Sequence, residues 1–175
     1  MNVNKIMFKL SVLLILFGIT ACSSNPDFKL YEGKPLNIAV IGEIPDVKEI
    51  QISFETIDFD HLLKEDLKRY DAVFITKENL SEASESKYAD VYLNSNLPFI
   101  FIEATKSYRS FIEKDLNYED DLDLKETSKH YAIGFLSSAE EEGKYWYYGL
   151  YNDKASPENI KEMYSRIFST IENSQ

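Results

Sequence analysis

The stretch LNIAVIG at residues 36–42 decides the fold class of this chain. It is a short, nearly continuous apolar run rich in β-branched residues, and it ends at Gly42. A run of this kind is typical of a strand that is buried on both faces, as in a parallel sheet. We interpret DAVFIT at 71–76 and the apolar run FIFIE at 99–103 as further strands. The stretch IQISFET at 50–56 alternates apolar and polar residues, which predicts a strand with one more exposed face.

Helical patterns separate these strands. We expect Asp60 to cap a helix that runs to about residue 70, and Asn79 to cap a second helix that ends before Pro98. A third helix is expected at 107–114. Ser156 followed by Pro157 is typical of a capped helix start. The expected inner face of this last helix consists of Ile160, Met163, Tyr164, Ile167, Phe168 and Ile171.

The C-terminal part predicts a different kind of pairing. Residues 131–136 and 144–151 read as the two strands of an antiparallel hairpin. Strands that alternate with helices favour a mostly parallel sheet covered on both faces. We therefore predict an α/β fold: a small three-layer sandwich with a mostly parallel sheet, an antiparallel C-terminal hairpin and helices on both faces. The order of the strands stays open.

The first residues have the pattern of an export signal. Lys5 and Lys9 precede an apolar stretch at residues 10–21. This stretch is shorter than the roughly 20 apolar residues that a helix needs to cross a bilayer, so it suits a signal core better than a permanent span. It ends in Ile19-Thr20-Ala21-Cys22, and polar residues follow.

The segment Ile19-Thr20-Ala21-Cys22 resembles the lipobox of bacterial lipoproteins, although Thr20 is a tolerated rather than a favoured residue there. In that family the cysteine sulfur receives a diacylglyceryl group, with acyl chains such as palmitate, and signal peptidase II cuts just before the cysteine. The resemblance implies cleavage between Ala21 and Cys22 and lipidation of Cys22, the only cysteine in the chain. The alternative is a chance cysteine beside an ordinary cleavage site. The number of membranes in the envelope stays open.

The expected organisation follows from that cleavage. Residues 1–21 form the lipoprotein signal peptide, residues 22–35 the lipidated cysteine and a flexible tether, and residues 36–175 a single α/β domain. Loss of Lys5 and Lys9 leaves 17 basic and 30 acidic residues, a net charge of −13. Such a surface repels nucleic acid and anionic headgroups. We therefore expect the lipid anchor alone to hold the chain on the extracytoplasmic face of the cell membrane, and we expect no nucleic-acid partner.

Polar residues follow several of the predicted strands. In open α/β sheets, ligands bind outside the carboxyl ends of the parallel strands. That rule points to Glu43 after the first strand, to Thr76 and Lys77 after the third, and to Glu103 and Lys106 after the fourth. These five residues are the candidate ligand-binding residues. The alternative interpretation is that strand-to-helix loops are polar in any protein.

Sequence signatures of catalysis and cofactor binding are missing. The chain has no dinucleotide fingerprint, no phosphate-binding loop and no GxSxG nucleophile elbow. His61 and His130 have no metal-ligand spacing, and the acidic stretches at 58–60, 119–123 and 140–142 do not fit a calcium loop. We therefore predict no catalytic residue, no metal site and no cofactor.

The most unusual local feature is the aromatic run Tyr145-Trp146-Tyr147-Tyr148. Strand alternation places Tyr145 and Tyr147 on one face, and Trp146 and Tyr148 on the other. One pair should belong to the core. The other pair either covers the final helix or presents a stacking surface for a sugar or a partner protein.

Taken together, these features favour a lipid-anchored, non-enzymatic binding or accessory module of the cell envelope. Its partner would be an unknown envelope protein or a small molecule. One alternative is an envelope enzyme, or a degenerate enzyme, that acts at the carboxyl ends of the strands. Another is a small solute-capture component of a transport system, although the usual two-lobed form of such a component needs a longer chain.

Overall fold

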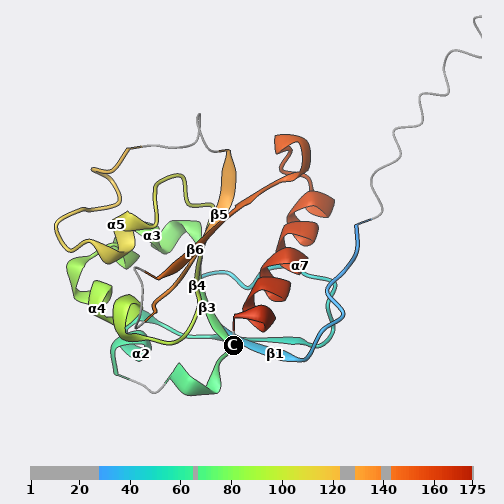
Figure 1. The fold of residues 1–175 in the computed structure, drawn as a ribbon, viewed down its shortest axis with the longest axis horizontal. Helices are drawn as coiled ribbons and strands as arrows, with labels where there is room; N and C mark the ends of the chain where they lie inside the picture. The colour runs from blue at the N-terminus through green and yellow to red at the C-terminus, as the bar shows by residue number, and fades with distance from the viewer. Residues whose placement is uncertain (1–27, 65–66, 123–128, 139–142, 175) are drawn as a thin grey trace, which may run out of the picture.

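A single six-stranded sheet forms the centre of the molecule, with the strand order β2-β1-β3-β4-β5-β6. The computed structural model describes residues 28–64, 67–122, 129–138 and 143–174 (Figure 1). Strand β1 pairs in parallel with β2 and β3, and β3 with β4, whereas β5 is antiparallel to both β4 and β6. The predicted mostly parallel sheet with an antiparallel C-terminal hairpin is therefore confirmed. The strands are β1 (Leu36–Ile41), β2 (Ile52–Thr56), β3 (Ala72–Ile75), β4 (Phe99–Ile102), β5 (His130–Leu136) and β6 (Lys144–Gly149).

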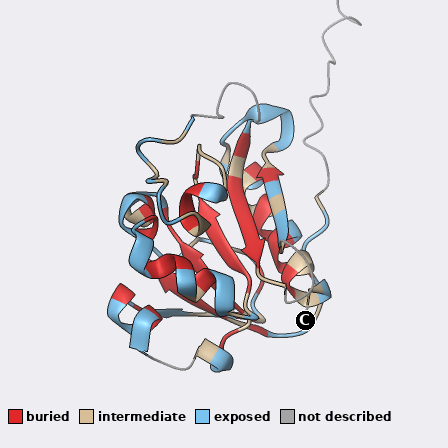
Figure 2. Cartoon of the chain, turned by 60° about the vertical axis from the view of Figure 1, so that its left-hand side comes forward, coloured by how far each residue is buried: buried red, intermediate tan, exposed pale blue. Residues whose placement is uncertain are grey.

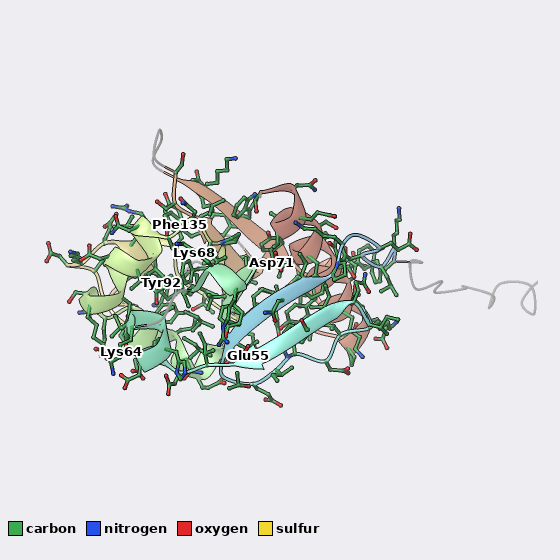
Figure 3. All side chains as sticks on the ribbon, turned by 90° about the horizontal axis from the view of Figure 1, so that it is seen from below. Glu55, Lys64, Lys68, Asp71, Tyr92 and Phe135 are labelled. Atoms are coloured by element: carbon green, nitrogen blue, oxygen red, sulfur yellow. The ribbon has the colours of Figure 1, made fainter. Side chains whose placement is uncertain are left out.

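Helices cover both faces of this sheet, so the predicted three layers are present. Helix α7 lies on one face, and α2, α3, α4 and α5 lie on the other (Figure 1). Burial alternates accordingly within a strand: Phe74 packs in the core under α7, whereas Val73 and Ile75 pack under the opposite helices. Tyr92 and Phe135, labelled in Figure 3, belong to that second core. The helices are α2 (Phe59–Lys64), α3 (Leu80–Ala83), α4 (Ser86–Asn94), α5 (Arg109–Ile112) and α7 (Pro157–Asn173), with the 3-10 turns η1 (Leu67–Arg69), η2 (Lys77–Asn79) and η3 (Tyr151–Asp153).

Helix α7 is the element that the sequence predicts best. The Ser156 side chain accepts a hydrogen bond from the backbone N–H of Asn159, and Pro157 occupies the first turn. The expected inner residues are buried, except Ile160, which is partly buried. Three aromatic rings join the helix to the sheet, because Phe74 stacks on Tyr164 at 6.1 Å and on Phe168 at 6.3 Å. In Figure 2 the central strands are buried along most of their length.

One expected helix is divided in the structure. The single helix expected between Asn79 and Pro98 is wrong, because α3 and α4 are separated at Ser84 and Glu85. The Ser84 hydroxyl donates to the Ser81 carbonyl and accepts from the backbone N–H of Tyr118, which stabilises the break.

The helix caps near the chain's middle also differ from expectation. Asn79 makes no capping hydrogen bond; its amide group donates instead to the Ile41 carbonyl, at 3.4 Å. Helix α2 is capped by Asp58 rather than Asp60, because the Asp58 carboxylate accepts from the backbone N–H of His61 at 2.8 Å.

Part of the expected tether packs against the domain. Phe28 contacts Tyr151 with ring centroids 5.6 Å apart, and the buried Tyr31 contacts Phe168 at 5.9 Å. The packed domain therefore includes residues before 36, among them Phe28 and Tyr31. The expected signal peptide, including Ala21, and the lipidation site Cys22 lie outside the described residues. Within the described ranges, no helix has both the length and the apolar character that a bilayer crossing requires.

Candidate functional site

All six strands of the sheet have an end at one of its edges. Strands β1, β2, β3 and β4 end at this edge because they are parallel. Strand β5 begins there and β6 ends there, because β5 runs antiparallel to both neighbours; Ile102 lies opposite Ala132, and His130 opposite Gly149. We call this the carboxyl edge of the sheet.

A pocket of about 390 Å³ lies at the carboxyl edge, over β3 to β6. Its volume falls within the range of about 300–1,000 Å³ that is common for small-molecule sites. The lining combines charged side chains with the less polar surfaces of tyrosine, leucine and alanine. The lining residues are Lys77, Glu103, Thr105, Lys129, His130, Tyr131, Leu150, Asp153 and Ala155.

Two ion pairs line this pocket. The Lys77 ammonium lies 3.4 Å from the Glu103 carboxylate, and the Lys129 ammonium lies 2.7 Å from the Asp153 carboxylate. The four side chains come from four separate segments, so the fold alone brings them together. Each is more than a third exposed. Exposed ion pairs contribute about 0–1 kcal/mol, so either pair can open at little cost to stability.

The backbone of the pocket residues has an unusual conformation. Among the described residues, four amino acids other than glycine have positive φ: Glu103 at 56°, Lys129 at 40°, Asn152 at 51° and Asp153 at 54°. Three of them line the pocket, and Asn152 precedes Asp153 directly. A residue with a side chain in this region costs about 1–3 kcal/mol, and such residues cluster at ligand-binding sites. The fold therefore holds three of the four charged side chains on strained backbone.

Tyr131 connects the pocket to the core under α7. Burial, which is the largest cause, and the interaction with the Glu103 carboxylate together raise the pKa of Tyr131 to about 12. The phenol is therefore protonated at neutral pH, and it lines the pocket together with the Glu103 carboxylate. His130, which also lines the pocket, is buried, and its ring centroid lies 5.0 Å from that of Tyr147.

The structure brings together two of the five predicted ligand-binding residues, Lys77 and Glu103. Glu43 is exposed at the end of β1 and is not part of the pocket lining. Lys106 lies on the loop after β4, where its ammonium donates to the backbone carbonyl of Asp121 at 2.8 Å.

Thr76, the remaining predicted residue, is buried and has a packing role. Its hydroxyl lies 2.5 Å from the Glu78 carboxylate. This hydrogen bond, with those from the backbone N–H groups of Glu78 and Glu43, lowers the pKa of Glu78. Gly42 permits the close approach: its φ is 116°, and a Cβ atom there would lie 1.8 Å from the Thr76 Oγ1 atom. The space beside Gly42, in the loop after β1, is therefore occupied by protein atoms.

The sequence interpretation missed the contribution of the hairpin. Lys129, His130 and Tyr131 come from the start of β5, and Leu150 and Asp153 follow β6. The rule that ligands bind outside the carboxyl ends of strands covers only the parallel strands. The predicted hairpin itself carried the missing signal, because an antiparallel strand beside the last parallel strand must begin at the same edge.

The two histidines lie in different places. His130 lines the pocket, whereas the ring of His61, on α2, lies 2.7 Å from the Asp58 carboxylate. In the part of the chain that the structure describes, no group of three or more histidine, cysteine or carboxylate side chains could hold a metal ion.

The faces of the aromatic strand are distinct. Trp146 and Tyr148 pack on the α7 side, and Tyr148 is buried. Tyr145 and Tyr147 lie on the opposite face and are 52% and 40% exposed. Tyr108, next to α5, stacks on Tyr145 at 4.6 Å, so these two tyrosines are only partly covered.

A second hollow of about 700 Å³ lies near the opposite edge of the sheet, between the α2–η1 region and α4. Lys68 and Asp71, which are labelled in Figure 3, belong to its lining. Asp71 accepts a hydrogen bond from the backbone N–H of Asn37, at 2.7 Å, and so joins β1 to β3. The carboxyl-edge pocket is the stronger candidate, because two ion pairs from separate segments meet there.

In comparisons with known proteins, no family model matches the chain, and neither a curated protein nor a solved structure matches it.

Proposed function

We propose that this chain is a lipid-anchored protein of the cell envelope that binds a small molecule in the carboxyl-edge pocket without transforming it. One observation carries the binding role: the two ion pairs, Lys77–Glu103 and Lys129–Asp153, line one pocket with Tyr131 and less polar side chains. A concave site with an apolar wall and a few convergent polar groups is the usual form of a ligand site.

The lining residues support binding rather than catalysis. Glu103 and Asp153 are each engaged by a lysine, so neither carboxylate is available as a general base while its ion pair is closed. A nucleophile within hydrogen-bond reach of a base is the usual signature of covalent catalysis. We therefore assign His130 to the pocket wall and give it no catalytic role.

The predicted anchor would hold the pocket close to the membrane. Phe28 contacts Tyr151 in η3, and η3 ends at Asp153 of the pocket. Cys22 precedes Phe28 by six residues, which can span at most about 20 Å. In this arrangement the anchor on Cys22 holds the chain at the extracytoplasmic face of the membrane, and the pocket binds molecules there.

The anchor is tested by replacing Cys22. In the producing bacterium, Cys22→Ala should move the protein from the membrane fraction to the soluble fraction and remove the acyl mass found by mass spectrometry. Ser23→Ala is the matched control and should remain membrane-bound and acylated. A Cys22→Ala protein that still sediments fully with membranes would exclude the lipid anchor.

The pocket is tested by filling it. Ala155 is exposed and lines the pocket, so Ala155→Trp should block the pocket without disturbing the core. Lys154→Trp is the control, because Lys154 is an exposed neighbour outside the lining. The full chain in detergent is screened by thermal unfolding against amino acids, peptides, sugars and nucleotides.

A ligand at 100 times its dissociation constant adds about 2.7 kcal/mol, which raises Tm by roughly 5–10 °C in a domain of this size. Ala155→Trp should abolish this shift, and Lys154→Trp should keep it. An equal shift in the Ala155→Trp protein would place the ligand outside the pocket and refute the proposal.

A further inference from the structure

The charges around the pocket alternate along the carboxyl edge. Lys77 follows β3, Glu103 follows β4, Lys129 precedes β5 and Asp153 follows β6. Because these strands are neighbours in this order, positive and negative groups alternate across the pocket. The four side chains balance one another, although the chain as a whole has a net charge of −11.

This balance restricts the charge of a ligand. A purely anionic molecule would face Glu103 and Asp153, and a purely cationic one would face the two lysines. A ligand group that lies next to a protein group of the same charge strongly disfavours binding. A molecule that carries one ammonium group and one carboxylate can pair with both kinds of side chain.

The existing ion pairs show where each ligand group would bind. Glu103 is the least exposed of the four charged side chains, at 39%, and it lines the pocket together with Tyr131. The Lys77 ammonium occupies the position that a ligand ammonium would take, and Lys77 is 67% exposed, so it can turn into solvent. Lys129 stands next to Glu103 along the edge and can donate to a carboxylate.

The remaining surface suits an apolar body. Leu150, Ala155 and the ring of Tyr131 line the pocket beside the charges. Building on the proposed binding function, we propose that the pocket binds a small zwitterion with an apolar body: an apolar amino acid or a short peptide with free termini. Its ammonium pairs with Glu103, and its carboxylate pairs with Lys129.

The proposal is tested with ligands that differ only in their ends. Dileucine, N-acetyl-dileucine and dileucine amide are titrated into the full chain in detergent by calorimetry, with leucine and phosphoethanolamine for comparison. Dileucine or leucine should bind, and blocking either end should weaken binding at least tenfold. Tighter binding of phosphoethanolamine would assign the pocket to a lipid headgroup and overturn the proposal.

Single substitutions assign each end to its partner. Glu103→Gln should remove the preference for a free ammonium group, so that dileucine and its N-acetyl form bind equally. Lys129→Met should remove the preference for a free carboxylate, and Lys77→Met should keep it. Glu85→Gln is the matched control, because Glu85 forms an ion pair with Lys87 outside the pocket, and it should leave all affinities unchanged.

The outcomes separate this proposal from the binding function itself. If the blocked peptides bind as tightly as dileucine, the zwitterion proposal fails, whereas the pocket remains a binding site. If no amino acid or peptide binds but another ligand is lost in Ala155→Trp, the ligand class alone is wrong. If no molecule binds in a way that Ala155→Trp prevents, both proposals fail.

Discussion

The left-handed backbone at Glu103 provides the sharpest test of how the pocket is built. Its φ of 56° disfavours any residue with a Cβ atom by about 1–2 kcal/mol. Glycine avoids this cost but loses about 0.5–1 kcal/mol more conformational entropy on folding than alanine does. Both Glu103→Ala and Glu103→Gly remove the ion pair with Lys77, so their difference isolates the backbone. We expect the Glu103→Gly protein to be the more stable, by about 0.5–1 kcal/mol.

The same pair of substitutions at Lys87 is the control. Lys87 is exposed in the first turn of α4, where glycine should be less stable than alanine by up to about 1 kcal/mol. The sign of the glycine–alanine difference should therefore reverse between the two positions. Urea unfolding followed by circular dichroism measures the free energy of unfolding of all four proteins.

If the glycine–alanine difference in the free energy of unfolding has the same sign at Glu103 and Lys87, the conclusion that the pocket stores backbone strain is refuted. A reversal would support it and would carry a functional consequence. The Glu103→Gly protein should then bind ligand more weakly although its backbone is more favourable, because it lacks the carboxylate that pairs with the ligand ammonium.

Three further predictions concern the packing and the titration of the domain. Gly42→Ala should lower the free energy of unfolding by about 2–4 kcal/mol in urea titrations, because the φ of Gly42 is 116° and a Cβ atom there would overlap Thr76. Gly149→Ala is the control and should have little effect. Glu49→Ala should lower the free energy of unfolding by about 2–3 kcal/mol in the same assay, because the buried carboxylate accepts from two backbone N–H groups and a serine hydroxyl. A loss below about 0.5 kcal/mol would contradict a stabilising role for these hydrogen bonds. Burial raises the pKa of Tyr131 from 10.0 to about 12, so the folded state binds this proton more tightly than the unfolded state. The stabilising contribution of Tyr131 is therefore complete below pH 10 and is lost between pH 10 and 12. The urea midpoint should fall over that range, and Tyr131→Phe should reduce the fall. An unchanged fall in the Tyr131→Phe protein would exclude Tyr131 as its source.

The sequence alone determined the elements whose evidence is local. The continuous apolar runs at β1 and β4 predicted buried parallel strands, and both strands lie inside the sheet. The 3.6-residue spacing of apolar residues and the Ser156 cap predicted α7. Both signals depend on neighbouring residues, because a strand buried on two faces and a helix buried on one face each impose a period that can be read within a single segment.

The break between α3 and α4 shows what local patterns miss. The apolar period continues across Ser84, and the sequence therefore predicted one helix. The break is stabilised by the backbone N–H of Tyr118, which donates to the Ser84 hydroxyl from 34 residues away. Similarly, Tyr31 is buried against Phe168 at the far end of the chain, although its own segment reads as a tether.

The candidate site depended most on tertiary structure. The sequence predicted Lys77 and Glu103 as ligand-binding residues at strand ends, and it predicted Thr76 and Lys106 on the same grounds. Only the packing shows that Thr76 is engaged with Glu78. Lys129 and Asp153 join the pocket because β5 pairs antiparallel with β4, and β6 with β5. Strand order decides which loops share an edge, and it follows from which apolar faces can be buried together. That is a property of the whole chain, and no local period encodes it.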